Sequence, residues 1–157
     1  MGKYDAVELH GAEKAGYVGR CLARIKRWGL TMPNVNPLAL HFGLGKFEEI
    51  GEIEFWIANE TKEGYCGKFL FVFDGQTCPY HHHAKKHETF YIVKGKVRMR
   101  IGDGEREMKE GDHLAMPPGT GHSFTGVGDS LLLEVSSPSV LQDNFFENKS
   151  IGDNGVI

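Results

Sequence analysis

The sequence predicts an all-β sandwich or barrel preceded by a single helix. Only residues 4–28 carry a helical pattern, in which Val18, Cys21 and Ile25 recur at spacings of three and four. From about residue 38, short runs rich in β-branched and aromatic residues alternate with glycine, aspartate and proline. Many short strands separated by such turns are typical of a sandwich or a barrel.

The expected strands fill the chain from residue 38 to residue 136. They cover residues 38–42, 49–59, 65–73, 78–83, 87–94, 96–102, 112–116, 121–126 and 130–136. Lys94-Gly95-Lys96 is expected to form a tight hairpin, and Asp103-Gly104 is a second turn signal. Residues 147–157 are expected to form a loosely held tail.

The composition is typical of a soluble globular protein with one domain. A chain of 157 residues predicts a single domain over 1–157, with the helical extension at about 4–28 and the strands within about 38–148. A net charge of −3 gives no electrostatic reason to expect nucleic acid or an anionic membrane as a partner. No apolar run is long enough to span a bilayer, and the charged first residues predict no signal peptide. Three cysteines at no metal-binding spacing indicate reduced thiols and a cytoplasmic location.

Four of the eight histidines fall in the segment HHHAKKH at residues 81–87. Successive side chains of a strand point to opposite faces, so His81 and His83 share a face while His82 points away. Glu88 begins the next expected strand, close enough to join them. Two imidazoles and a carboxylate suit Mn²⁺, Fe²⁺, Co²⁺, Ni²⁺ or Zn²⁺. Taken alone, the run is equally consistent with a solvated turn.

A regular spacing of glycines surrounds these histidines. Gly75 is followed after five residues by His81 and then by His83. Glu88 follows His83 after four intervening residues, and Gly95 follows Glu88 after six. This wider pattern is much less compatible with a mere solvated turn than the histidine run alone.

A second string of spaced residues lies further along the chain. Gly111 is followed after five residues by Pro117, then by Gly119 and, after two more residues, by His122. The two strings resemble the paired motifs of the cupin superfamily, G(x)5HxH(x)4E(x)6G and G(x)5PxG(x)2H. The asparagine that often follows four residues after the last histidine is replaced by Gly126. That asparagine is not a metal ligand in the family.

The resemblance implies a cupin double-stranded β-helix, a jelly-roll barrel that holds one divalent metal ion. The ligands implied by the motifs are His81, His83, Glu88 and His122. Manganese is the expected metal, with zinc, iron, cobalt and nickel as alternatives. Water or a substrate oxygen would fill the remaining coordination positions.

A narrower resemblance surrounds the motifs. The stretch FDGQTCPYHHHAKKHETF resembles the metal-binding segment of D-lyxose isomerases, which are cupin sugar ketol-isomerases. Residues 41–52 and 131–148 agree with it, although the chain is shorter than typical members between the two motifs. The resemblance implies a metal-dependent aldose–ketose isomerase that acts on a free sugar such as D-lyxose or D-mannose.

Two charged residues match the acid and base candidates of that family, Lys68 and Glu134. Lys68 shares a strand face with Leu70 and Val72, and Glu134 shares one with Leu132. A charge inside a strand otherwise committed to the core needs a partner or a purpose. The alternative is that the two form a buried ion pair, or that either lies in water at the barrel mouth.

The expected reaction is an enediol proton transfer. Glu134 would carry the proton between the two carbons, and Lys68 would move or stabilise the proton between the two oxygens. A hydride shift between the carbons would need the metal but no carboxylate base. Asp143 and Asn144 lie in a segment that resembles the closing loop of the family, which makes them candidates to bind substrate hydroxyls.

Other functions remain open at the level of sequence. A cupin dioxygenase would use the same four ligands with Fe²⁺, and a phosphosugar isomerase is a closer rival. A non-catalytic sugar-binding cupin would need the metal but not the charged pair. Lys85 and Lys86 are adjacent cations that a phosphate would suit, but we expect them in a solvated turn. A homodimer is expected because small cupins commonly pair through sheet edges and N-terminal elements.

Overall fold

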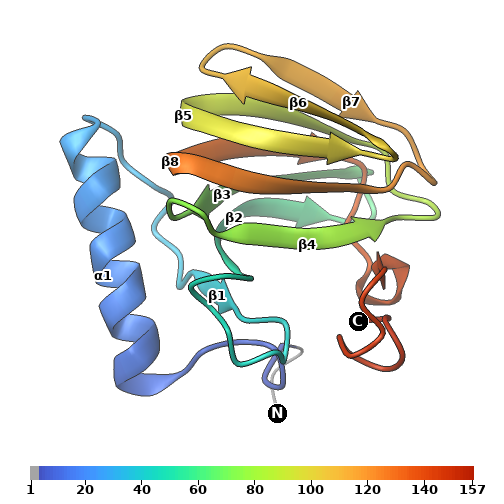
Figure 1. Ribbon diagram of the computed structural model, residues 1–157, viewed down its shortest axis with the longest axis horizontal. Coiled ribbons are helices and arrows are strands. Elements are labelled where there is room, and N and C mark those ends of the chain that lie inside the picture. The colour runs from blue at the N-terminus through green and yellow to red at the C-terminus, as the bar shows by residue number, and fades with distance from the viewer. Residues whose placement is uncertain (1–3) are drawn as a thin grey trace.

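The computed structural model describes residues 4–157 as a curled sheet of nine strands with one α-helix (Figure 1). The helix α1 spans Gly11–Arg27, and the short 3-10 helix η1 spans Leu141–Asp143. The strands are β1 (Leu38–Leu40), β2 (Glu52–Glu60), β3 (Tyr65–Val72), β4 (Thr77–His82), β5 (Glu88–Ile101), β6 (Gly104–Lys109), β7 (His113–Met116), β8 (His122–Ser136) and β9 (Phe145–Phe146).

Strand β8 holds the sheet together. Its first half pairs with β4 and with the end of β5, and its second half pairs with β3 and with the start of β5, always antiparallel. Figure 1 shows β5, β6 and β7 above β8, with β2, β3 and β4 below it. This is the jelly-roll arrangement that the two motifs imply, together with the helix that the spacing within residues 4–28 predicts, so the expected fold class is confirmed.

The predicted hairpin at Lys94-Gly95-Lys96 is wrong, because β5 runs through it without a turn. Gly95 has a φ of 79°, and the pairing of β5 with β8 is irregular on both sides of Lys94. A β-carbon at Gly95 would lie 2.4 Å from the carbonyl oxygen of Asp129. The glycine therefore serves a bulge where two strands approach closely, a use that sequence alone does not separate from a turn.

Two further strand predictions need correction. The expected strands 121–126 and 130–136 are one continuous strand, β8, which passes through Gly128 at a φ of 78°. Strand β6 was not predicted, because its sequence GEREMK is charged and mostly exposed on both faces. It pairs only with β5, so it is an edge strand that shows little of the usual apolar alternation.

The helix begins at Gly11 rather than near residue 4. Gly11 has a φ of 58°, which interrupts any regular helix at that point, and Glu8 forms a β-bridge with Leu40 instead. The helix buries Cys21 and Ile25 against the outside of the sheet. No helix within residues 4–157 is long and apolar enough to cross a membrane.

The predicted loose tail at residues 147–157 is wrong. Ile151 is 0% exposed and packs with Val7, Leu40, Phe42 and Phe146. This small apolar cluster fixes the C-terminal segment and the N-terminal segment to the same part of the barrel. Apolar burial therefore outweighs the polar composition that suggested a tail.

The inside of the barrel is apolar at one end and charged at the other. Leu70 and Val72 of β3 belong to the main apolar cluster, together with Phe124 and Leu132 of β8. Lys68 lies two residues before Leu70, on the same face of β3, but outside that cluster. The charged side chains therefore lie at one end of the barrel interior, next to the main apolar cluster.

Candidate metal centre and active site

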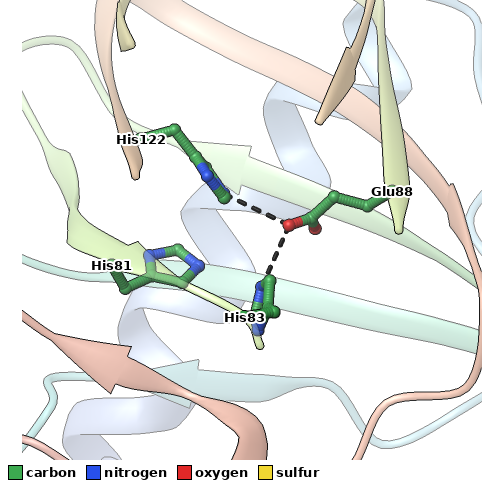
Figure 2. Close-up of side chains that lie close together, drawn as sticks. All are labelled: His81, His83, Glu88 and His122. Atoms are coloured by element: carbon green, nitrogen blue, oxygen red, sulfur yellow. Dashed lines mark ion pairs between the residues drawn. The ribbon is translucent and has the colours of Figure 1, made fainter. Parts of the chain in front are cut away.

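Four side chains converge inside the barrel (Figure 2). One nitrogen or oxygen from each lies within 4.8 Å of the others, and the four residues are His81, His83, Glu88 and His122. Strand pairing places His81 directly opposite His122, while Glu88 begins β5. Glu88 and His122 are each 1% exposed. Antiparallel pairing thus brings together residues that are up to 41 positions apart in the chain.

Backbone carbonyls orient the three imidazole rings. Each ring bonds through its Nδ1 to a backbone oxygen, in the pairs His81 with Pro79 (2.7 Å), His83 with Asp143 (2.9 Å) and His122 with Thr120 (2.9 Å). A carbonyl only accepts, so each Nδ1 carries the hydrogen and Nε2 is left with a lone pair. Fixing the far side of a ring in this way is the usual means by which proteins aim a histidine at a metal.

The ligand set fits a divalent cation. Oε2 of Glu88 lies 2.9 Å from Nε2 of His83 and 3.2 Å from Nε2 of His122. None of these three buried atoms has a hydrogen-bond partner among the residues described. A divalent cation bound among these lone pairs would satisfy all three atoms. Burial, and then the neighbouring His122 and His83, hold the pKa of His81 well below its ordinary value, so this ring is neutral, as a metal ligand must be.

Lys68 and Glu134 face each other across strands β3 and β8, where they are paired in register. Both are buried, and Nζ of Lys68 lies 3.9 Å from Oε1 of Glu134. A shorter contact of 2.8 Å joins the same Nζ to Oε1 of Glu54 on β2. The lysine therefore lies between two carboxylates within the barrel.

Lys86 is a buried residue of this site, and the expectation that it belongs to a solvated turn is wrong. It is 4% exposed, and its Nζ lies 2.7 Å from Oε2 of Glu134 and 3.4 Å from Oε1 of Glu88. Its neighbour Lys85 is exposed, as expected. Lys86 thus links the metal-ligand group to Glu134.

Comparison with known proteins gives a family for this architecture. Residues 68–136 match the family model of the cupin domain. This segment contains Lys68, Lys86, Glu134 and all four metal-ligand candidates. This segment of the chain is a cupin domain. This assignment agrees with the two motifs, the jelly-roll sheet and the buried ligand set.

Two similar proteins carry the name of a sugar isomerase. The cupin is 32% identical to the D-lyxose/D-mannose isomerase of Thermosediminibacter oceani over 74% of this chain and 64% of that one. It is 29% identical to the D-lyxose ketol-isomerase of a Thermofilum species, over 70% and 76% of the respective chains. The cupin therefore spans less than two thirds of the Thermosediminibacter protein.

A solved structure shares the fold over nearly the whole chain. The L-ribose isomerase of Cellulomonas parahominis, determined with L-ribose, superposes with a TM-score of 0.75 over 96% of this cupin and 97% of that chain. The two sequences are 16% identical. At that identity the superposition establishes a shared fold.

Asp143 holds the loop between the metal ligands of this cupin. Its carboxylate accepts hydrogen bonds from the backbone N–H groups of Ala84, Lys85 and Lys86, at 2.9 to 3.2 Å. Its own carbonyl oxygen is the one that bonds His83. These bonds give Asp143 a positioning role, while its contact with a sugar hydroxyl stays a prediction.

Asn144, the second residue predicted to bind the substrate, does line the cavity. Its Nδ2 donates a hydrogen bond of 2.8 Å to the carbonyl oxygen of Leu141. A longer bond of 3.4 Å joins the same Nδ2 to the carbonyl oxygen of Val140, which leaves the amide oxygen of Asn144 as the group that can bind a hydroxyl. Its role in sugar binding stays a prediction.

Replacing Asp143 with alanine is expected to weaken metal binding by about tenfold to a hundredfold, the usual effect of losing a group that positions a ligand. The N–H groups of the loop lose their acceptor, so the backbone carbonyl that bonds His83 is no longer anchored to that loop. Titration of the purified variant with Mn²⁺ would measure the change. Asp153→Ala, in an exposed turn, is the control and should bind as the parent does. Equal affinities in all three proteins would contradict this role.

Burial and neighbouring charges together set the pKa values of the ionisable groups in the cavity. Burial alone lowers the pKa of Lys68 and of Lys86, but nearby carboxylates, Glu134 above all, raise both pKa values above normal. Burial raises the pKa of Glu54, but the charge of Lys68 and the hydrogen bonds from Glu52, Lys68 and Trp56 together bring the pKa below normal. The pKa of Glu52 is raised well above its ordinary value by burial and by the charge of Glu54. Both lysines are therefore charged, whereas the raised pKa of Glu52 favours its protonated form.

The cavity of this cupin extends from the metal-ligand group along β3 and β2. It is lined by the charged residues above and by Tyr4, Val7, Leu40, Phe42, Trp56, Leu70, Cys78, Phe90, Phe124, Ser139, Asn144, Phe146 and Ile157, among others. Glu52 and Glu54 were not singled out from the sequence, although both lie in the expected strand 49–59. Their signal was the alternation of β2, where Glu52, Glu54 and Trp56 share one face and apolar residues occupy the other.

Proposed function

We propose that this cupin is a metal-dependent aldose–ketose isomerase that acts on a free sugar such as D-lyxose or D-mannose. The observation that carries the proposal is the carboxylate of Glu134, which is 2% exposed and lies between two buried ammonium groups beside the metal-ligand residues. A carboxylate held in this way is available as a base at one fixed position. The similarity to named D-lyxose isomerases supports the same function.

The metal, expected to be Mn²⁺, would be held by His81, His83, Glu88 and His122. When bound, a divalent ion supplies polarisation of the sugar carbonyl and stabilises negative charge on the reacting oxygens. The ligand set itself contributes one negative charge, from Glu88. The Nδ1 bonds to backbone carbonyls keep the three rings in a fixed orientation during the reaction.

Glu134 is the proposed base. It takes the proton from the carbon next to the carbonyl and returns it to the former carbonyl carbon, so that no atom is gained or lost overall. Lys86 holds one oxygen of the carboxylate, and Lys68 lies near the other. We propose that Lys68 assists the transfer of the hydroxyl proton between the two sugar oxygens.

The charges of the cavity support an unphosphorylated substrate. Both buried ammonium groups in the lining, on Lys68 and Lys86, already contact carboxylates. A phosphate brought into the cavity would meet the carboxylates of Glu54 and Glu134 and would have to compete for those lysines. A neutral sugar carries no such penalty.

The Glu134→Gln variant tests the proposed base. Glutamine preserves the shape of the side chain but cannot accept the proton, so kcat is expected to fall by about a hundredfold to ten-thousandfold. Formation of ketose from D-lyxose and D-mannose with Mn²⁺ supplied would measure it. Glu63→Gln, in an exposed turn, should keep the parent rate.

Two outcomes would count against this function. Full activity in Glu134→Gln, with deuterium on the reacting carbon fully retained in the ketose, would favour a hydride shift over proton transfer. Absence of turnover by the metal-loaded parent protein on every free aldopentose and aldohexose would reject the isomerase itself.

A further inference from the structure

A continuous chain of buried charged side chains lies along the inner wall of the barrel. It starts at the metal-ligand residue Glu88, which Lys86 contacts at 3.4 Å, and continues from Lys86 to Glu134 at 2.7 Å. Lys68 follows at 3.9 Å from Glu134 and lies 2.8 Å from Glu54 on strand β2. Carboxylate and ammonium groups alternate along the whole chain. Each charge in it therefore has a partner of opposite sign.

Glu52 lies next to Glu54, beyond the last ion pair of this chain. It is two residues from Glu54 on the same face of β2, and it is 4% exposed. Cys78, which lies beside it, precedes the metal-ligand residue His81 by three residues on β4. Three residues of strand correspond to about 10 Å. Glu52 thus lies on the cavity wall at some distance from the metal-ligand group.

One oxygen of Glu52 is left without a partner. Its Oε2 is buried and makes no hydrogen bond within residues 4–157, although the side chain lines the cavity. Apart from Glu52, the buried side-chain atoms that lack a partner in this part of the chain all belong to the metal-ligand group, where a cation would satisfy them. A buried polar atom with no partner is costly in a folded protein and often marks where a ligand binds.

The position and chemistry of Glu52 suit a hydroxyl group. The side chain of Glu52 is already hydrogen-bonded to Glu54 and Cys78, but its Oε2 remains free to accept a hydrogen bond from a sugar hydroxyl. The charged members of the chain are already engaged with one another, so Glu52 is the member with spare hydrogen-bonding capacity. A sugar held at the metal by its carbonyl end would place its remaining hydroxyls along this wall.

We infer that Glu52 binds a sugar hydroxyl remote from the metal-bound end of the substrate and thereby selects which sugars are accepted. This inference rests on the proposed function for its substrate class. The competing explanation is purely structural, in which Glu52 only shares a proton with Glu54. The two explanations differ in one respect, because only a substrate contact makes the effect of Glu52 depend on which hydroxyl the sugar carries.

The test compares D-lyxose with its three analogues that each lack one hydroxyl beyond carbon two. In the parent protein, kcat/KM is expected to fall by about tenfold to a hundredfold for the analogue that lacks the recognised hydroxyl. In Glu52→Met, which fills similar space without hydrogen-bonding groups, that penalty should shrink to less than about threefold. Glu52→Gln can still donate and accept, and it should retain most of the penalty. Glu63→Met is the matched control on an exposed turn.

A binding measurement keeps the test independent of catalysis. The quenching of tryptophan fluorescence by the pentitol of D-lyxose, and by its deoxy analogues, reports the same discrimination without turnover, and Trp56 lines the cavity. A parent protein without isomerase activity would reject the proposed function, while this comparison would still decide the role of Glu52. If Glu52→Met discriminates among the deoxy compounds as the parent does, the inference is overturned.

Discussion

The His122→Ala variant is expected to lose the metal ion. His122 is 1% exposed, and its Nε2 points at Oε2 of Glu88, 3.2 Å away. Losing even an outer partner of a metal ligand lowers affinity by about tenfold to a hundredfold, so loss of a ligand should cost more than about a hundredfold. Metal analysis of the purified protein, after dialysis against metal-free buffer, should show about one divalent ion per chain in the parent and almost none in the variant.

His87→Ala is the matched control for that experiment. His87 lies in the same histidine-rich segment, but its side chain is exposed and it is not one of the four converging residues. Its replacement should leave the metal content unchanged. A His122→Ala protein that retained the ion as firmly as the His87→Ala protein would show that the metal-ligand assignment is wrong.

The Lys86→Met variant is expected to be destabilised by about 3–5 kcal/mol. Methionine fills much of the space of the lysine stem, but Glu134 and Glu88 lose a buried positive charge that lies 2.7 Å and 3.4 Å from their oxygens. Removing one partner of a buried ion pair leaves the other charge without compensation. Urea unfolding of the metal-free protein would measure the loss.

Lys85→Met separates burial from charge in this experiment. The two lysines are adjacent in sequence and carry the same charge, but Lys85 is exposed. A surface change of this kind usually alters stability by less than about 0.5 kcal/mol. Similar losses in the two variants would mean that the contacts of Lys86 with the carboxylates contribute little to folding.

The short-range parts of the metal centre could be predicted from sequence because strand geometry fixes them locally. His81 and His83 are two residues apart in an extended segment, so they must share a face. The distant ligand His122 was found only through the resemblance to the cupin motifs. Strand pairing then places it opposite His81, which no local pattern shows.

The residues that sequence analysis missed depend on how the barrel closes. Lys86 lies in a loop with the polar composition of a solvated turn, and only the packing of that loop over Glu134 buries it. Glu52 and Glu54 belong to a face that becomes the cavity wall once β2 pairs with β3. The expected homodimer and the cytoplasmic location stay predictions.

Strand β8 carries His122 at its first residue and Glu134 twelve positions later. Because side chains alternate along a strand, one inserted or deleted residue between them would turn either the imidazole or the carboxylate out of the barrel. Natural relatives that keep both chemistries should therefore hardly vary in the number of residues between them. The length of this stretch is a constraint separate from the packing of its buried residues.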